Sequence, residues 1–255
     1  MKRSRSARRF VNWSVAGLAA LSLGMFAFSL PPDPGAEVIR AMHNQWKGKW
    51  YENMAFEQKA LFYKDGKVVR SEVWQELLNS PGNLHIRFNG FGSGNGAIYS
   101  RDSVYQFKGG VLQTKRPDVN FLALLGFDVY FYEPEATLSR LKGLGFDLGK
   151  SYRTSFKGRD VVVVGAAGPD DRSSSQFWVD SERMMVLRAV KNTGNAVRDV
   201  HFNRYRQIHG NWVATEMVFT DGSDTVFSEE YYNISFPKKV TGAIFDPACF
   251  AGARW

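Results

Sequence analysis

Residues 53–90 read NMAFEQKALFYKDGKVVRSEVWQELLNSPGNLHIRFNG. Apolar and polar side chains alternate through most of this stretch, which is the period of a half-buried β-strand. Asp65–Gly66 and Pro81–Gly82 interrupt the alternation with residue pairs that favour tight turns. The stretch therefore predicts three strands joined as successive hairpins, because the turns leave no room for the crossover helices that a parallel sheet needs.

The same alternation continues along the rest of the chain. After residue 90 it resumes at Tyr99 and at 105–107, followed by a turn at Gly109–Gly110. Later strands are expected at residues 150–156, 161–165, 176–179, 185–190, 197–205, 212–220 and 225–234. A count of about 11 or 12 strands at this spacing favours a curled or closed antiparallel sheet over a flat one. No linker or repeat divides residues 30–255, so we expect one mainly β (α+β) domain.

Three segments depart from the strand period. Residues 35–47 place large apolar side chains at helical spacing, and Pro34 suits the first turn of that helix. Residues 117–131 form a dense apolar run, and residues 134–144 place leucines on one side. We expect two short helices in this middle part, or one helix and an ordered apolar loop. They are too short to span a membrane.

The N-terminus predicts export. The first ten residues, MKRSRSARRF, contain five basic and no acidic residues, and an apolar stretch then runs from Ser14 to Leu30. This order is typical of a signal peptide, here residues 1–29, with small side chains at Ala27 and Ser29 before the cleavage site. An uncleaved signal anchor is the alternative, although the stretch is slightly shorter than the roughly 20 residues of a spanning helix.

Charge and cysteine content narrow the function further. Five positive charges leave with the signal peptide, so +3 of the formal +8 remains, interspersed with acidic residues. This distribution excludes the clustered basic surface of a nucleic-acid-binding protein. The single cysteine, Cys249, predicts no internal disulfide and no lipid anchor at the start of the exported chain.

Motifs for catalysis, metals and phosphate are lacking. His85 and His201 fall on predicted strands and could meet, but a metal would need further ligands. The glycines of residues 92–96 enter a strand instead of a helix, so they predict a hairpin turn and not a phosphate site. We expect no catalytic residue, no metal and no cofactor.

Carboxylates on neighbouring strands leave one enzymatic reading open. Glu57, Glu72 and Glu76 would have to converge in a cleft with a raised pKa to act as an acid–base pair. Cross-strand pairing with Lys59 or Arg70 explains the same residues without chemistry.

Aromatic content is high, with 20 Phe, 10 Tyr and 7 Trp, mostly on strand alternates and in residues 121–132. Two interpretations follow. The aromatic side chains either fill a β core, or they line a concave sheet too wide for its own side chains, with the apolar helical segment as a lid.

Several stretches resemble the LolA-like family of periplasmic lipoprotein carriers and sorting proteins. They are NMAFEQK (53–59), NSPGNLHIRF (79–88), RDSVYQFKGG (101–110), QFWVDSERMMVLRAV (176–190) and VHFNRYRQIHGNWVATEMVF (200–219). The resemblance implies an unclosed antiparallel half-barrel, short helices over its opening, and a hydrophobic cavity that binds or senses acyl chains. Carriers of this family place an arginine before the proline of the second hairpin, where this sequence has Ser80.

This reading predicts a binding site made of apolar side chains. We expect the cavity wall to comprise Met54, Phe56, Trp74, Leu84, Ile86, Phe88, Tyr105 and Phe107. We expect the lid to comprise Phe121, Leu122, Leu124, Leu125 and Phe127. Because side chains alternate between faces, a slip of one residue would turn a whole strand's set outward.

The predicted function is therefore that of a periplasmic protein, soluble after signal cleavage and not an enzyme. It would bind a lipid or an acylated lipoprotein, in lipoprotein sorting or envelope maintenance. The alternative is a non-carrier sensor or protein-interaction module of the cell envelope on the same fold, with an envelope protein as its partner.

Overall fold

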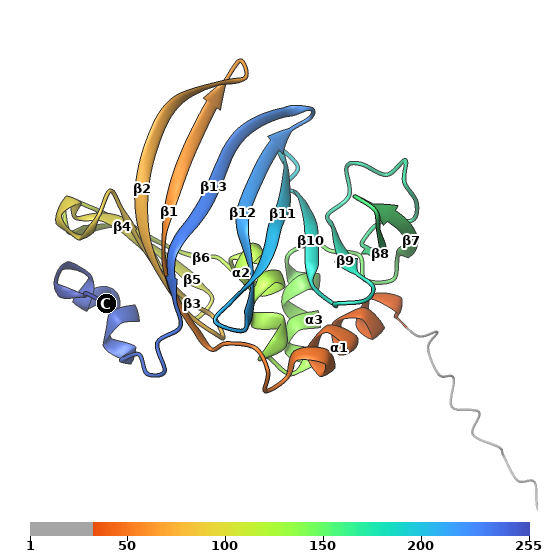
Figure 1. Ribbon diagram of the computed structural model, residues 1–255, viewed down its shortest axis with the longest axis horizontal. Coiled ribbons are helices and arrows are strands. Elements are labelled where there is room, and N and C mark those ends of the chain that lie inside the picture. The colour runs from red at the N-terminus through yellow and green to blue at the C-terminus, as the bar shows by residue number, and fades with distance from the viewer. Residues whose placement is uncertain (1–32) are drawn as a thin grey trace, which may run out of the picture. The chain divides into compact units, whose positions relative to one another are not determined.

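The computed structural model describes residues 33–255 (Figure 1). The predicted signal peptide and its cleavage site lie outside these residues. The strands are β1 (Asn53–Lys64), β2 (Lys67–Asn79), β3 (Asn83–Phe88), β4 (Asn95–Ser100), β5 (Ser103–Lys108), β6 (Val111–Pro117), β7 (Ser151–Phe156), β8 (Arg159–Val164), β9 (Gln176–Asp180), β10 (Val186–Asn192), β11 (Val197–Ile208), β12 (Asn211–Asp221) and β13 (Asp224–Ser235). The helices are α1 (Pro34–Trp46), η1 (Phe91–Ser93), α2 (Phe121–Gly126), η2 (Asp128–Tyr130), α3 (Pro134–Gly143), η3 (Gly242–Phe245) and η4 (Pro247–Gly252).

All 13 strands form one antiparallel sheet in the order β6-β5-β4-β3-β2-β1-β13-β12-β11-β10-β9-β8-β7. Strands β1–β6 and β7–β13 each pair in sequence order, and the pairing of β1 with β13 joins these two halves of the chain. The sheet is not closed, since β6 and β7 are its two edges. The predicted mainly β class and meander of hairpins are confirmed.

The strand that the sequence did not predict is β6. All seven of its residues, 111–117, are exposed, so the strand lacks the alternation of apolar and polar residues that marks a half-buried strand. Its partner β5 supplies its backbone hydrogen bonds on one side only, because β6 lies at the edge of the sheet.

Local signals position the helices where the pattern predicted them. The Asp33 side chain accepts a hydrogen bond from Ala36 N at the start of α1, and Pro34 occupies the first turn. The Asn120 side chain accepts from Leu122 N and Ala123 N at the start of α2. No helix in residues 33–255 is long and apolar enough to cross a membrane.

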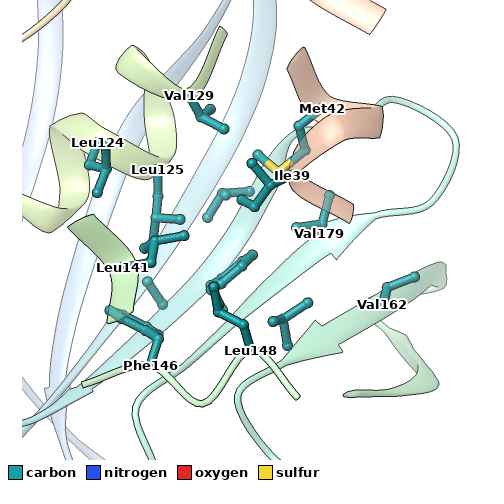
Figure 2. Close-up of a cluster of buried hydrophobic side chains, with 14 of the residues drawn as sticks. Ile39, Met42, Leu124, Leu125, Val129, Leu141, Phe146, Leu148, Val162 and Val179 are labelled. Carbon is teal, nitrogen blue, oxygen red and sulfur yellow. The ribbon is translucent and has the colours of Figure 1, made fainter. Parts of the chain in front are cut away.

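Helices α1, α2 and α3 pack against one face of the sheet, which we call the inner face. Figure 2 shows this contact: Ile39 and Met42 of α1, Leu124 and Leu125 of α2, and Leu141 of α3 point toward the strands. They meet buried side chains of β8–β12, namely Val162, Val164, Phe177, Val179, Val186, Ala189, Val200, Phe202 and Met217. This cluster holds the helices over the second half of the sheet.

The opposite, outer face carries the C-terminal segment, residues 242–255. The Phe250 ring stacks on Phe107 of β5, with ring centroids 3.8 Å apart. The buried Arg87 guanidinium of β3 donates to the backbone oxygens of Phe250 and Ala253. At Gly96 of β4 a Cβ atom would lie 2.1 Å from a backbone oxygen of β3, so only glycine fits there. The C-terminal segment therefore buries part of the outer face of β2–β5, including Leu77, Ile98 and Phe107.

Candidate ligand-binding site

A small hollow of about 80 Å³ lies between the inner face and helix α2. We call it the α2 hollow. Strands β1–β3 contribute Phe56, Trp74, Glu76, Leu78, Leu84 and Ile86 to its lining. The segment around α2 contributes Asn120, Leu122, Ala123 and Phe127, and strands β12 and β13 contribute Met217, Glu229 and Tyr231. Most of these side chains are apolar, which is typical of a site for a small apolar ligand.

The structure brings together much of the predicted wall. Phe56, Trp74, Leu84 and Ile86 line the α2 hollow. Met54 shares the inner face with them but lies deeper, fully buried among Tyr51, Phe56 and Val213. Phe88 lies directly opposite Trp74 in the β2–β3 pair, with ring centroids 4.5 Å apart.

Tyr105 and Phe107 do not belong to this wall, and their predicted placement was wrong. Phe107 packs against Phe250 on the outer face, where Tyr105 also contacts the cluster around the C-terminal segment. The inner face of β5 carries Val104, which is fully buried, and Gln106, which is exposed. The alternation of β5 marks Tyr105 and Phe107 as its more apolar face, but it cannot say whether that face turns toward the helices or toward the C-terminal segment.

The predicted lid is helix α2 with the residue that follows it. Leu122 and Phe127 point to the α2 hollow. Leu124 and Leu125 lie instead in the core between helices and sheet, fully buried, and Phe121 packs on the edge of that core. The helix therefore covers the hollow with one side and is anchored by the other.

The turn between β2 and β3 adjoins this lid. Ser80, at the position of the carriers' arginine, is buried there. Asp128 of η2 lies against the same turn, and burial raises its pKa to about 6 although Gly82 and Ser80 offset part of that effect. A separate, more polar groove of about 650 Å³ runs beside the turn and is bordered by Tyr105, Tyr132 and residues of η3.

Polar groups that the sequence did not indicate as a set lie in the α2 hollow and beside it: Glu76, Glu229 and Tyr231 line it, and Gln58 lies on the same face outside its lining. Tyr231 Oη donates to Glu229 Oε2 at 2.8 Å. Burial raises the pKa of Glu229 to about 7. Burial and the neighbouring Glu229 charge hold the pKa of Glu76 well above its usual range. Gln58 is fully buried on the same face, and neither of its side-chain polar atoms has a hydrogen-bond partner in residues 33–255. We call these four residues the polar cluster.

The three carboxylates considered from the sequence do not converge. Glu57 points to the outer face, where its Oε2 accepts from Asn233 at 3.0 Å. Glu72 accepts from Trp74 Nε1 at 2.7 Å and pairs with Arg70 at 2.8 Å. Of these three, only Glu76 lines the hollow, where Glu229 is its neighbour. The sequence offered one sign that Glu229 faces inward, namely that it shares strand parity with the aromatic residues Phe227 and Tyr231.

Aromatic rings continue the inner face beyond the hollow, toward the far ends of β1, β2, β12 and β13. This aromatic band comprises Phe62, Trp74, Phe88, Phe219 and Phe227. Ring centroids of Phe62 and Phe227 are 4.8 Å apart, and those of Phe219 and Phe227 are 5.1 Å apart. Every one of these rings is only partly buried.

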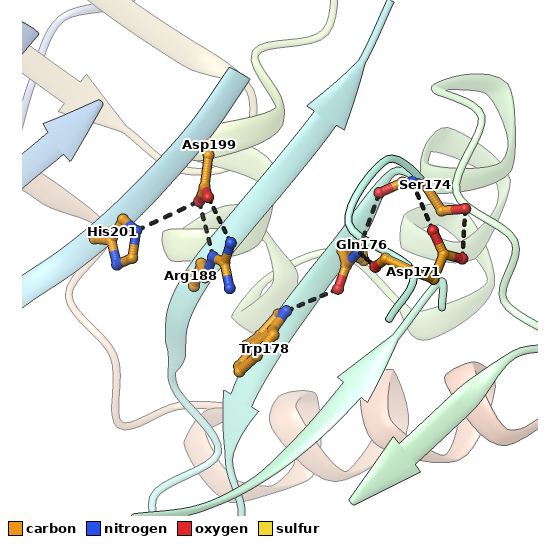
Figure 3. A network of polar contacts seen from close by, with 7 residues as sticks. All are labelled: Asp171, Ser174, Gln176, Trp178, Arg188, Asp199 and His201. Atoms are coloured by element: carbon orange, nitrogen blue, oxygen red, sulfur yellow. Dashed lines mark hydrogen bonds and ion pairs between the residues drawn. The ribbon is translucent and has the colours of Figure 1, made fainter. Parts of the chain in front are cut away.

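The remaining candidates lie elsewhere. His85 is on β3 and His201 on β11, five strands apart in the sheet, so they do not meet. Figure 3 shows His201 beside Asp199, its Nε2 3.5 Å from Oδ1, and Arg188 Nε donating to Asp199 at 2.8 Å. Within residues 33–255 no group of three His, Cys, Asp or Glu is placed to hold a metal. The glycine-rich stretch forms η1 and its turn, and Cys249 is exposed.

Comparison with solved structures identifies the fold. The chain is similar to a DUF1329 family protein from Desulfovibrio piger (TM-score 0.56, 15% identity, 86% of this chain and 100% of that one). It is similar to an outer membrane lipoprotein-sorting protein domain from Vibrio parahaemolyticus (0.54, 16%, 85% and 98%). It is also similar to a LolA superfamily protein from Nitrosomonas europaea (0.52, 13%, 82% and 96%). No protein-family model and no curated protein sequence matches the chain. The predicted LolA-like fold is confirmed.

Proposed function

We propose that this protein binds a lipid, or the acyl chain of a lipoprotein, between helix α2 and the inner face of its sheet. The observation that carries the proposal is the apolar α2 hollow, covered by Leu122 and Phe127 and continued by the aromatic band. The similarity to a lipoprotein-sorting domain and to a LolA superfamily protein supports the same class of ligand. The predicted export signal supports a periplasmic location, in lipoprotein sorting or envelope maintenance.

The size of the hollow defines how such a ligand enters. Its volume of about 80 Å³ is well below the roughly 300 Å³ at which typical ligand pockets begin. An acyl chain therefore has to take the place of Leu122 and Phe127, which move aside with α2. At ~0.8 kcal/mol for each buried CH₂, a 16-carbon chain gains on the order of 13 kcal/mol, partly offset by displaced contacts and chain ordering.

A binding role fits the hollow better than catalysis. Glu76 and Glu229 form a carboxyl pair with raised pKa values. However, the lining described above includes no Ser, Cys, Lys or His that would serve as a nucleophile or shuttle a proton. We assign these carboxyls to ligand recognition.

Native mass spectrometry of the protein purified from a bacterial periplasm tests the proposal. We expect a bound acylated molecule that is lost in Trp74→Asp and retained in Val73→Asp. These residues are neighbours on β2, but Trp74 faces the hollow while Val73 is 43% exposed on the outer face. Circular dichroism of both variants checks that the fold is kept.

The opposite result would refute acyl-chain binding. If the wild-type protein carries no bound mass and takes up neither added lipids nor lipopeptides, the aromatic side chains serve only as a core. A protein partner of the cell envelope, captured under the same conditions, would then support a sensor or interaction module.

A further inference from the structure

The polar cluster has a fixed geometry in the sheet register. Gln58 of β1 lies directly opposite Trp74 on β2 and Tyr231 on β13. Its inner-face neighbours along β1 are Phe56, opposite Glu76, and Ala60, opposite Glu229. Glu76 and Glu229 therefore flank Gln58 from the two adjacent strands, one step below it and one step above it.

This cluster lacks positive charge. Neither Glu76 nor Glu229 forms an ion pair with a Lys, Arg or His in the part of the chain that the structure describes. On β2 the nearest charges along the inner face are Glu72 and Arg70, which pair with each other. Strands β3 and β12 and helix α2 contribute only uncharged residues to the hollow.

Hydrogen bonding in the cluster is also incomplete. Glu76 is 6% exposed, and the residues around it supply no hydrogen bond to its carboxyl within 33–255. Gln58 lies close enough to Glu229 to favour its charged form, but the contact does not reach hydrogen-bond geometry. A buried amide with neither its donors nor its acceptor satisfied costs free energy, and the same holds for a buried carboxylate without a cation.

A ligand that satisfies these groups must carry positive charge and several N–H donors. A primary ammonium provides one positive charge and three donors, which match the two carboxyls that line the hollow. A carboxylate or phosphate would add negative charge to a hollow that already holds two acidic groups. The apolar wall around the cluster requires that the rest of the ligand be hydrocarbon.

We propose that the α2 hollow selects amphiphiles whose polar end is a primary ammonium group. Glu76 and Glu229, which line the hollow, hold the ammonium, and the hydrocarbon chain packs on Trp74, Ile86 and Leu122. The proposal rests on the proposed function, because it names the polar end of the ligand that the same hollow binds. Binding of the cation favours the ionised carboxyls, so the ligand releases protons from the protein and binds more tightly as the pH rises through about 7.

Isothermal titration calorimetry with dodecylamine, dodecanol and dodecanoate tests this inference, because these probes share one chain length. Dodecylamine is cationic at neutral pH, since alkylamines such as the lysine side chain have a pKa of about 10.4. We expect dodecylamine to bind at least about tenfold more tightly than dodecanol at pH 8, as a charged hydrogen bond predicts. We expect a smaller ratio at pH 5.5, and we expect dodecanoate to bind most weakly at pH 8.

Isosteric variants assign the preference to the two carboxyls. Glu76→Gln together with Glu229→Gln should bind dodecylamine and dodecanol about equally, while retained dodecanol binding shows that the hollow is intact. Glu57→Gln, on the outer face of β1, is the matched control and should keep the preference. Equal affinity for amine and alcohol in the wild-type protein, or a preference that survives the double substitution, would overturn the proposal. Failure to bind dodecanol as well would overturn the proposed function itself.

Two sources can supply an ammonium beside a hydrocarbon chain. One is a lipidated peptide with a free amine, and the other is a phospholipid whose ammonium is accompanied by a phosphate. Comparing an acylated peptide that bears a free amine with lysophosphatidylethanolamine distinguishes them. If either compound binds more tightly than its N-acetylated counterpart, ammonium recognition is supported. If acetylation weakens the binding of neither compound, ammonium recognition is contradicted.

Discussion

Replacing Glu229 by glutamine should stabilise the fold at alkaline pH and leave it little changed in acid. Burial raises the pKa of Glu229 from 4.5 to about 7 in the folded protein. The folded state therefore binds this proton more tightly than the unfolded state does. Its stabilising contribution is complete below pH 4.5 and is lost as the pH rises through about 7.

The magnitude follows from the same two values. Each pKa unit corresponds to about 1.4 kcal/mol, so a rise from 4.5 to about 7 corresponds to about 3 kcal/mol of lost stability at high pH. Glutamine does not titrate and keeps nearly the same shape. The free energy of unfolding of Glu229→Gln, relative to wild type, should thus increase by about 3 kcal/mol between pH 4.5 and pH 8.5.

Urea unfolding of both proteins across this pH range, followed by tryptophan fluorescence, measures the difference directly. Asp128 also has a raised pKa, so it also makes the fold less stable as the pH rises. Both proteins contain Asp128, so its contribution cancels in the difference between them. Glu57→Gln is the control from the outer face and should not reproduce the rise. A Glu229→Gln difference that stays constant with pH, or that favours the wild type in alkali, would refute the assigned burial of this carboxyl.

Three further predictions, one of them with a control substitution, test other parts of the structure. Phe250→Ala should lower the free energy of unfolding by roughly 3–5 kcal/mol, because the ring is buried in the outer-face cluster. Cys249→Ser, at an exposed neighbour, should change it little, and equal effects in denaturant unfolding would contradict this. Asp199→Asn should lower the pKa of His201 further in an NMR titration, because burial already lowers it and Asp199 opposes that effect; a rise would refute the contact. Gly96→Ala should prevent stable folding, since its Cβ would meet a β3 carbonyl oxygen at 2.1 Å, and a wild-type melting temperature would contradict this.

The sequence predicted the fold where one face of a strand is apolar and the other polar. Strands β1 and β2 alternate over most of their length, and the structure brings their residues Phe56 and Trp74 to the same face, beside the α2 hollow. Helices α1 and α3 carry apolar side chains at helical spacing, and both formed where that spacing predicted them. The local sequence pattern was enough to predict these elements, because their apolar residues are the ones that the fold buries.

Prediction failed where burial is decided by distant parts of the chain. The face of β5 that bears Phe107 is buried only because the C-terminal segment folds back on it, more than 130 residues later. Likewise, Glu76 and Glu229 are more than 150 residues apart in sequence, and they become neighbours only because β13 pairs with β1. A local sequence pattern cannot predict a contact that depends on the pairing of β13 with β1.

Photo-crosslinking with an alkyl chain that bears a diazirine tests the central claim most directly, because the label marks the residues that surround the chain. We expect labelled peptides that contain the residues of β1–β3 lining the α2 hollow, and peptides from residues 120–127. Trp74→Asp and excess unlabelled dodecanol should both suppress this labelling. Labelling confined to the outer face or the C-terminal segment, or labelling that excess dodecanol does not reduce, would contradict a ligand site beneath helix α2.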